Sequence, residues 1–163
     1  MDLEEEIRRI LEKNFWLVLS TVNEKNQPQS CVVIYQSDGH NIFVQTGTET
    51  LKANNIRKNS QVSVTIPFRK NLLHKFIPAP PAELHFKATA ELLPFEDAEA
   101  RQVFRKYLKQ INQVSLPQKS IWIKITPKSP IATYGVGIRL IQMRNPSKAR
   151  NLINLKYMDR ELY

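Results

Sequence analysis

Apolar and polar positions alternate in several short runs of the chain, as in strands, and recur every three to four residues in others, as in helices. Strands are predicted over residues 15–22, 29–36, 42–46, 61–68, 83–93 and 120–126, with a further β segment over 131–143. Helices are predicted over 2–13, about 49–58 and 96–111. The short turns after Val22 and Gln36 leave room only for antiparallel neighbours. The chain is therefore predicted to be mostly β, with peripheral helices.

The strand that begins at Asn41 passes through a threonine-rich turn into a short basic helix. Thr46 and Glu49 have the spacing of a capping box, which predicts that the helix begins just after Thr46. The hydroxyls of Thr46, Thr48 and Thr50 and the ammonium of Lys52 would then converge at the helix start. A helix N-terminus favours an anion, so this stretch predicts a phosphate site. The alternative is an ordinary capped helix that binds no ligand.

Three further segments of the chain are predicted to lie at the surface of the barrel. In the strand 120–126 the isoleucines are expected to face inward, so Trp122 is predicted to point outward, toward solvent, a cofactor ring or another subunit. Residues 69–81 combine prolines with apolar residues, which predicts a covering lid, an interface arm or a loop that caps the barrel end. The segment 144–163 is predicted to be a helical tail, capped by Ser147 after Pro146.

Length and composition limit the possible classes. A chain of 163 residues fits a single domain, 1–163, and its one cysteine, Cys31, excludes an internal disulfide framework. We expect Cys31 to be a small core residue rather than a redox thiol. No apolar run approaches the roughly 20 residues that span a bilayer, and the acidic start of the chain does not resemble a signal peptide. We therefore expect a cytoplasmic protein without a membrane segment.

The net charge of +9 is unevenly distributed, because residues 100–158 contain twelve Lys or Arg and no acid. Such a surface attracts anionic partners, although an ordinary solvated basic surface is the alternative. The helix 96–111 has a basic face, but strands rather than a partner helix flank it, so nucleic-acid recognition is not expected.

Side-chain chemistry offers no catalyst that the sequence identifies. No Gly-x-Ser-x-Gly elbow, His-Glu-x-x-His motif or phosphate-binding glycine loop occurs. The three histidines lie too far apart in sequence to form a local metal pair. No catalytic residue and no metal site are assigned. This pattern is compatible with chemistry that a bound cofactor performs while the protein orients it.

The order of these elements resembles the FMN-binding split-barrel family related to pyridoxamine 5′-phosphate oxidase. The resemblance is carried by short motifs in chain order: Leu19-Ser20-Thr21, Pro28, Phe43 to Thr46, Thr50 with Lys52, Asn55-Ile56 and Val62-Ser63. It covers residues 3–93 well and 119–136 loosely. It implies an antiparallel six-stranded split β-barrel that forms a homodimer, with the flavin held between subunits. It also implies that loop 69–81 lies near the cofactor and the dimer interface.

The resemblance also implies a set of cofactor-binding residues. Thr46, Thr50 and Lys52 match the family's ribityl-phosphate contacts, and the strand from Ser30 to Val33 matches the one whose backbone edges the flavin ring. The full set is Ser30, Cys31, Val32, Val33, Gln45, Thr46, Thr50, Leu51, Lys52 and Trp122. Cys31 and Leu51 stand where pyridoxamine phosphate oxidases place phosphate-binding arginines, which argues against that particular activity.

Two functions of different class follow from the resemblance. The first is an FMN-dependent oxidoreductase whose small-molecule substrate the sequence does not identify. The alternative is a non-catalytic protein of the same fold that binds a deazaflavin, haem or a polyanion.

Overall fold

The computed structural model describes residues 2–69, 81–111, 119–128 and 130–155. The helices in this part are α1 (Leu3–Lys13), α2 (Leu51–Lys58) and α3 (Ala98–Ile111), with short 3-10 helices η2 (Leu140–Arg144) and η3 (Pro146–Lys148). The strands are β1 (Trp16–Val22), β2 (Pro28–Ile34), β3 (Gln36–Ser37), β4 (Ile42–Gly47), β5 (Gln61–Phe68), β6 (Ala82–Pro94), β7 (Ser120–Pro127), β8 (Ile131–Tyr134) and β9 (Arg150–Ile153). None of the described helices is long and apolar enough to cross a bilayer.

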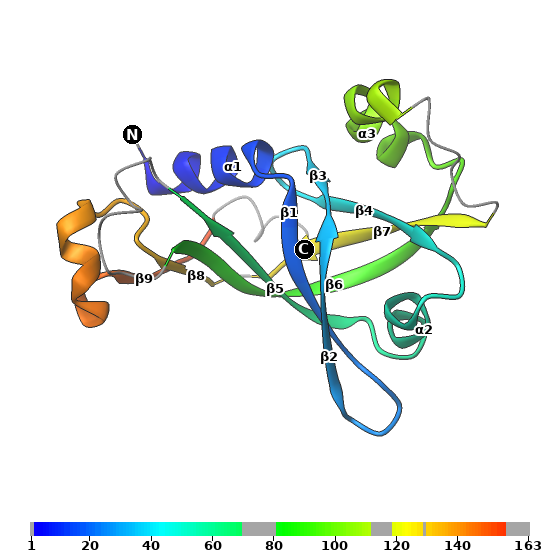
Figure 1. The fold of residues 1–163 in the computed structure, drawn as a ribbon, viewed down its shortest axis with the longest axis horizontal. Coiled ribbons are helices and arrows are strands. Elements are labelled where there is room, and N and C mark those ends of the chain that lie inside the picture. Colours follow the sequence, from blue (N-terminus) through cyan, green and yellow to red (C-terminus); the bar gives the residue numbers. More distant parts are fainter. Residues whose placement is uncertain (1, 70–80, 112–118, 129, 156–163) are drawn as a thin grey trace, which may run out of the picture.

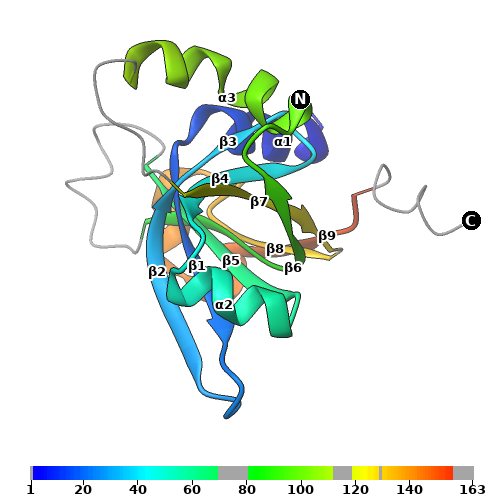
Figure 2. The same cartoon turned by 90° about the vertical axis from the view of Figure 1, so that its right-hand side faces the viewer.

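All nine described strands form one antiparallel sheet in the order β2-β1-β5-β6-β7-β4-β3, with β8 pairing with β6 and β9 with β8. The sheet curls, so that β2 comes into contact with β4, although β1, β5, β6 and β7 lie between them in the strand order. Figures 1 and 2 show the result, a half-barrel with helices at its periphery. The predicted fold class is confirmed. The six predicted strands are present, β8 lies within the further β segment predicted over 131–143, and β3 and β9 add to them.

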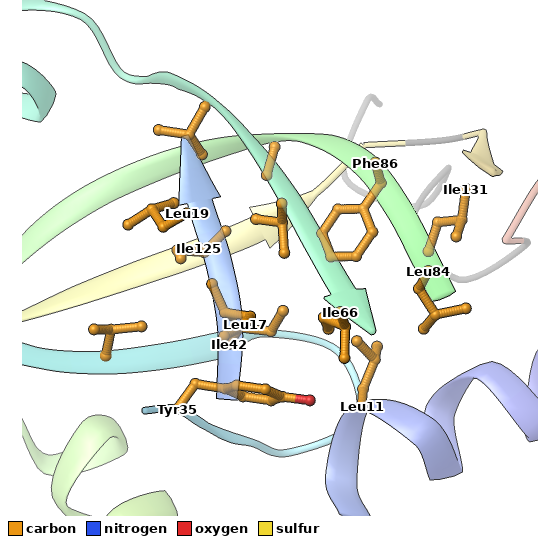
Figure 3. Packing of buried hydrophobic residues seen from close by; sticks show 14 of the residues in the cluster. Leu11, Leu17, Leu19, Tyr35, Ile42, Ile66, Leu84, Phe86, Ile125 and Ile131 are labelled. Atoms are coloured by element: carbon orange, nitrogen blue, oxygen red, sulfur yellow. The ribbon is translucent and has the colours of Figure 1, made fainter. Parts of the chain in front are cut away.

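The inner face of the curled sheet forms the main core. Leu84, Phe86, Ala88 and Ala90 alternate along β6 and are all buried, as predicted, while His85 between them is exposed. Helix α1 covers one end of the barrel, because its apolar stripe inserts Ile7 and Leu11 into the same core (Figure 3). Tyr35 lies in this core with its hydroxyl unpaired within the described chain, and burial raises the pKa of Tyr35 above its usual range.

A second, smaller core lies outside the barrel under α3, and it corrects the prediction for Trp122. The indole is fully buried against Phe43, Phe95 and Phe104, and its Nε1 donates to Phe95 O at 2.9 Å. Trp122 does face away from the barrel interior, as the alternation of β7 requires. The prediction of exposure was wrong because α3 folds back over this face and removes it from solvent.

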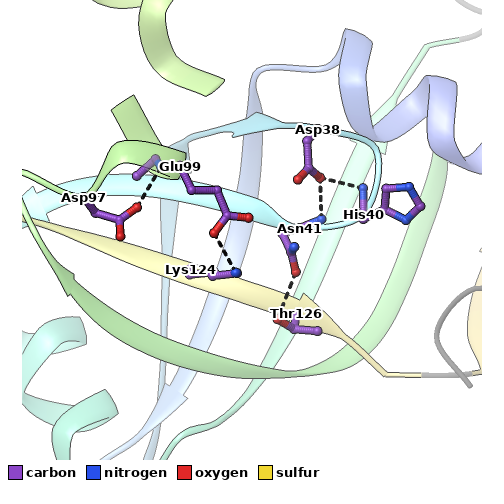
Figure 4. Close-up of polar contacts among 8 residues, drawn as sticks. Asp38, His40, Asn41, Asp97, Glu99, Lys124 and Thr126 are labelled. Atoms are coloured by element: carbon purple, nitrogen blue, oxygen red, sulfur yellow. Dashed lines mark hydrogen bonds and ion pairs between the residues drawn. The ribbon is translucent and has the colours of Figure 1, made fainter. Parts of the chain in front are cut away.

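An ion pair joins α3 to the sheet, and a hydrogen bond caps the start of the helix. Lys124 of β7 donates to Glu99 at 2.8 Å, and this contact raises the pKa of Lys124 (Figure 4). Asp97 accepts from the backbone N–H of Ala100 at 2.9 Å, as a helix cap does. The helix thus begins with a hydrogen-bonded cap.

The C-terminal third differs most from the prediction. The β segment expected over 131–143 ends at Tyr134, because Gly135 and Gly137 adopt φ values of +77° and +68° that turn the chain into η2. In residues 144–155, the described part of the expected helical tail, the chain forms the short turn η3 and then β9. Residues 156–163 and most of loop 69–81, including His74, lie outside the described residues.

We predict that Trp122→Ala lowers the free energy of unfolding by about 3–5 kcal/mol, since it empties the centre of the second core. Urea denaturation followed by circular dichroism measures the change. Trp16→Ala is the matched control, because Trp16 is the other tryptophan and is only half-buried. Equal losses for the two variants would contradict the packing role of Trp122.

Candidate functional site

The candidate site lies where the two ends of the curled sheet approach each other. β2 pairs only with β1, and β3 covers only the first two residues of β4. Within the described strands, Val44 to Gly47 therefore have one backbone edge without a strand partner, and so does all of β2. Unpaired backbone N–H and C=O groups on such edges need water or a ligand as partner. We call this place, between β2 and the end of β4, the seam.

Three predicted phosphate ligands meet at the end of β4. The Oγ1 atom of Thr46 lies 3.2 Å from that of Thr50, and Lys52 Nζ donates to Thr46 Oγ1 at 3.4 Å. Thr46 is almost fully buried, whereas Thr50 and Lys52 are half-buried. The ammonium of Lys52 has no carboxylate partner in the described part of the chain, so its charge is available to an anion.

The helix start differs from the predicted capping box. α2 begins at Leu51, and its N-cap is Thr50, whose Oγ1 accepts from Ala53 N at 3.4 Å. Thr46 and Glu49 do not form the cap. The move of the N-cap from Thr46 to Thr50 leaves the candidate phosphate site in place. The first backbone amides of α2 still lack intrahelical acceptors, and they follow directly after Thr50.

Asn55 fixes the position of α2 against the β1–β2 hairpin. Its Nδ2 donates to Thr21 Oγ1 of β1 at 2.9 Å and to Gln29 Oε1 of β2 at 2.8 Å. Asn55 and Thr21 are both buried, so the bond between them forms largely out of water, whereas Gln29 is exposed. The sequence marked Asn55 only as part of a family motif and not as a site residue. Its signal was an amide on the same helix as the buried Ala53 and Ile56, where an apolar residue is expected.

The predicted ring-binding strand presents two different faces. Ser30 and Val32 are exposed on the outer face, and Val32 keeps 67% of its surface accessible. Cys31 and Val33 are half-buried on the inner face, where Val33 packs on the core. Ser30 Oγ lies 2.8 Å from Ser20 Oγ of β1. Cys31 is half-buried, so it is neither the fully buried core residue that the sequence predicted nor a fully exposed thiol.

The other predicted cofactor-binding residues lie at different distances from the seam. Leu51 is exposed at the first position of α2, next to Lys52. Gln45 is half-buried, and its Nε2 reaches Ser120 Oγ of β7 at 3.5 Å. Trp122 pairs with Gln45 in register but lies under α3, so it is not at the seam.

Thr48 was expected to join the other hydroxyls, but none of its described contacts reaches them. Its N–H donates to Lys119 O at 3.1 Å, and its carbonyl accepts from Arg57 at 2.7 Å. Thr48 Oγ1 is buried without a hydrogen-bond partner in the described chain. Arg57 thereby ties the loop before α2 to the helix itself.

The donor set of the seam fits a phosphate monoester. It combines two hydroxyls, one ammonium and the free amides of a helix start, all of which can donate to phosphate oxygens. The set does not fit a metal, since no group of three or more His, Cys, Asp or Glu is present among the described residues. The exposed apolar residues Val32 and Leu51 are available for the ring end of a phosphorylated cofactor.

An antiparallel half-barrel with a phosphate-type donor set at its seam defines a split β-barrel protein. The family model described as pyridoxamine 5′-phosphate oxidase matches residues 3–133, and the chain belongs to this family. A search of curated proteins found no match to the sequence.

Solved structures agree on the fold. The haem storage protein HutZ from Vibrio cholerae has a TM-score of 0.66 at 23% identity, over 84% of this chain and 98% of its own. A putative pyridoxamine 5′-phosphate oxidase from Listeria innocua has a TM-score of 0.60 at 24% identity, over 78% and 95%. A haem binding protein from Mycobacterium smegmatis has a TM-score of 0.68 at 14% identity, over 98% and 61%. At these identities the likeness shows the fold alone.

We predict that Asn55→Ala lowers the free energy of unfolding by about 1–3 kcal/mol, because it leaves the buried Thr21 hydroxyl without its donor. Asn54→Ala is the control on the same helix, since Asn54 is half-buried and its Nδ2 makes only one long contact, 3.4 Å, to Glu49 O. Chemical denaturation measures both variants. A loss no larger than that of Asn54→Ala would show that Asn55 does not hold α2 in place.

Proposed function

We propose that the protein binds FMN and acts as an FMN-dependent oxidoreductase on a small-molecule substrate. The observation that carries the proposal is the contact among Thr46, Thr50 and Lys52 at the start of α2. Within the described residues Lys52 has no carboxylate partner, and such a cation beside two hydroxyls and free amides is suited to the doubly charged phosphate of FMN.

In this proposal the rest of the seam holds the flavin ring. The free backbone edge of β2 from Ser30 to Val33 supplies hydrogen-bonding groups for the ring's polar edge, and the exposed Val32 and Leu51 supply apolar contact. When bound, the flavin accepts and donates hydride, which no side chain of this chain can do. The protein's own residues fix the phosphate, hold the ring along β2 and keep water from one of its faces.

Haem or a deazaflavin remains the alternative ligand. Two of the similar structures are described as haem proteins, one for storage and one for binding. Against haem stands the absence of His or Cys among the donors that meet at Thr46, Thr50 and Lys52, since these hydroxyls and this ammonium bind an anion rather than iron. An absorbance spectrum of the purified protein separates the ligands, because an oxidised flavin and haem have distinct visible bands.

We predict that Lys52→Ala weakens FMN affinity by about tenfold to a hundredfold, since it removes a charge-assisted hydrogen bond worth roughly 1.5–3 kcal/mol. Titration of the cofactor-free protein with FMN, followed by flavin fluorescence, gives the dissociation constant. Riboflavin, which lacks the phosphate, should bind both proteins equally.

Lys58→Ala is the matched control. Lys58 lies in the last turn of α2, where it pairs with Glu24, so its loss changes the net charge equally but leaves the helix start intact. If Lys52→Ala and Lys58→Ala lose the same small amount, Lys52 is part of a general basic surface. If neither loses affinity, the phosphate binds elsewhere.

The proposal includes a homodimer, on grounds that differ from the sequence prediction. Trp122 no longer supports an interface because it is buried, and residues 72–77 lie outside the described chain. What supports it is the outer face of β2, where Val32 and Ile34 are 67% and 46% exposed, next to the free β2 edge. Exposed apolar residues beside an unpaired strand are suited to a second copy of the chain.

We predict a dimer of about twice 19.0 kDa in sedimentation equilibrium at micromolar concentration. Val32→Glu should convert it to monomer, because each copy would bury a charge in the interface. Ile141→Glu serves as control, since Ile141 is equally exposed, at 70%, but lies on η2. A parent protein that sediments as a monomer contradicts this part of the proposal.

A further inference from the structure

The β8–β9 end of the sheet lies far from α2 (Figure 1). A hollow of about 680 Å³ is formed there by residues of β6, β8 and β9. Its lining comes from three adjacent strands: Glu83 and His85 of β6, Ala132, Thr133 and Tyr134 of β8, and Arg150, Asn151 and Leu152 of β9. This volume is typical of small-molecule sites. The hollow shares no residue with the seam.

The register of the three strands explains the shape. Directly paired residues share a face, and pairing places Glu83, Tyr134 and Arg150 in one row and His85, Ala132 and Leu152 in the next. Ala132 is small and sits between two larger side chains, so it forms a low floor. Tyr134 is buried, because it packs on Met143 and donates to its carbonyl, and it therefore bounds the hollow on the η2 side.

The first row contains two side chains of opposite charge, Glu83 and Arg150. Neither Glu83 nor Arg150 has an ion-pair partner in the described part of the chain, and they do not pair with each other. They stand on opposite sides of β8, two strand spacings apart, which is roughly 10 Å. Unpaired opposite charges at that separation, on either side of a low floor, match a ligand that carries both charges.

The second row adds one oriented polar group and one apolar group. His85 is fixed by a 2.9 Å hydrogen bond between its Nδ1 and Thr65 Oγ1 of β5, which leaves Nε2 for a ligand. Leu152 is 74% exposed at the rim, beside Arg150. An apolar ligand body would cover it and recover its hydrophobic contact.

We propose that this hollow is a binding site for a small zwitterion with an apolar middle, of the amino-carboxylic acid type. Its carboxylate bonds to the Arg150 guanidinium, its ammonium to the Glu83 carboxylate, and its apolar body lies over Ala132 against Leu152. Arg150 presents two parallel donors to a carboxylate, which makes that end of the ligand the better defined.

The test uses 4-(aminomethyl)benzoate as probe, with benzoate and benzylamine as probes that lack one charge each. Titrations of the ¹⁵N-labelled protein, followed through backbone amide shifts, give affinity and location together. We expect saturable shifts confined to β6, β8 and β9, and tighter binding of the zwitterion than of either single-charge probe. Arg150→Gln should weaken the zwitterion and benzoate by about tenfold without affecting benzylamine. Glu83→Gln should weaken the zwitterion and benzylamine without affecting benzoate.

Arg144→Gln and Glu91→Gln are the charge-matched controls, since both residues are exposed and lie outside the hollow. Arg150→Lys keeps the charge without the planar fork and should recover only part of the loss. Amide spectra of each variant confirm that it is folded. The proposal is overturned if the parent shows no saturable shifts on these strands, or if the controls lose as much affinity as the variants of the hollow.

Discussion

The curled sheet brings β2 beside β4 without pairing their backbones, and the rest of the molecule is arranged around that unpaired seam. A sheet edge buried without partners costs free energy for each orphan N–H and C=O. α1 covers one end of the barrel with Ile7 and Leu11, and α2 is fastened near the seam by the Asn55 bonds to Thr21 and Gln29. The end of β4 leads directly into a helix start rich in donors, which is where we propose that a phosphorylated ligand binds.

β7 shows how one strand can serve two cores. Ile123 and Ile125 face the barrel, whereas Trp122 faces α3, so both faces of the strand are buried. The aromatic packing of Phe43, Phe104 and Trp122 holds α3, and the Lys124–Glu99 ion pair adds a contact at its edge. Both faces of the pair β4–β7 are therefore packed, and Thr46 at the end of β4 pairs with Ile121 of β7.

The outer face of the sheet is used in two separate regions. At the β2 end it is apolar and beside a free edge, and at the β9 end it contains the hollow with Glu83, His85 and Arg150. β1 and β5 lie between them and carry Ser20, Ser63 and Thr65 on this face. The chain can therefore present an interface and a ligand site on one sheet without sharing residues.

The sequence alone determined the elements whose signals are local. Alternation gave the buried face of β6, the spacing of apolar residues gave α1 and α3, and short turns gave the antiparallel pairing. The sequence also predicted that Thr46, Thr50 and Lys52 lie at one site, because a strand end, a turn and a helix start are contiguous.

Tertiary structure decided which element packs against each face of a strand or helix. Alternation placed Trp122 outside the barrel, but only the return of α3 over β7 decided that it is buried. The cap moved from Thr46 to Thr50, since the β4 strand continues through Thr46 to Gly47. The pairing of β8 with β6, 47 or more residues earlier in the chain, created the hollow, and no local pattern contains a contact over that separation.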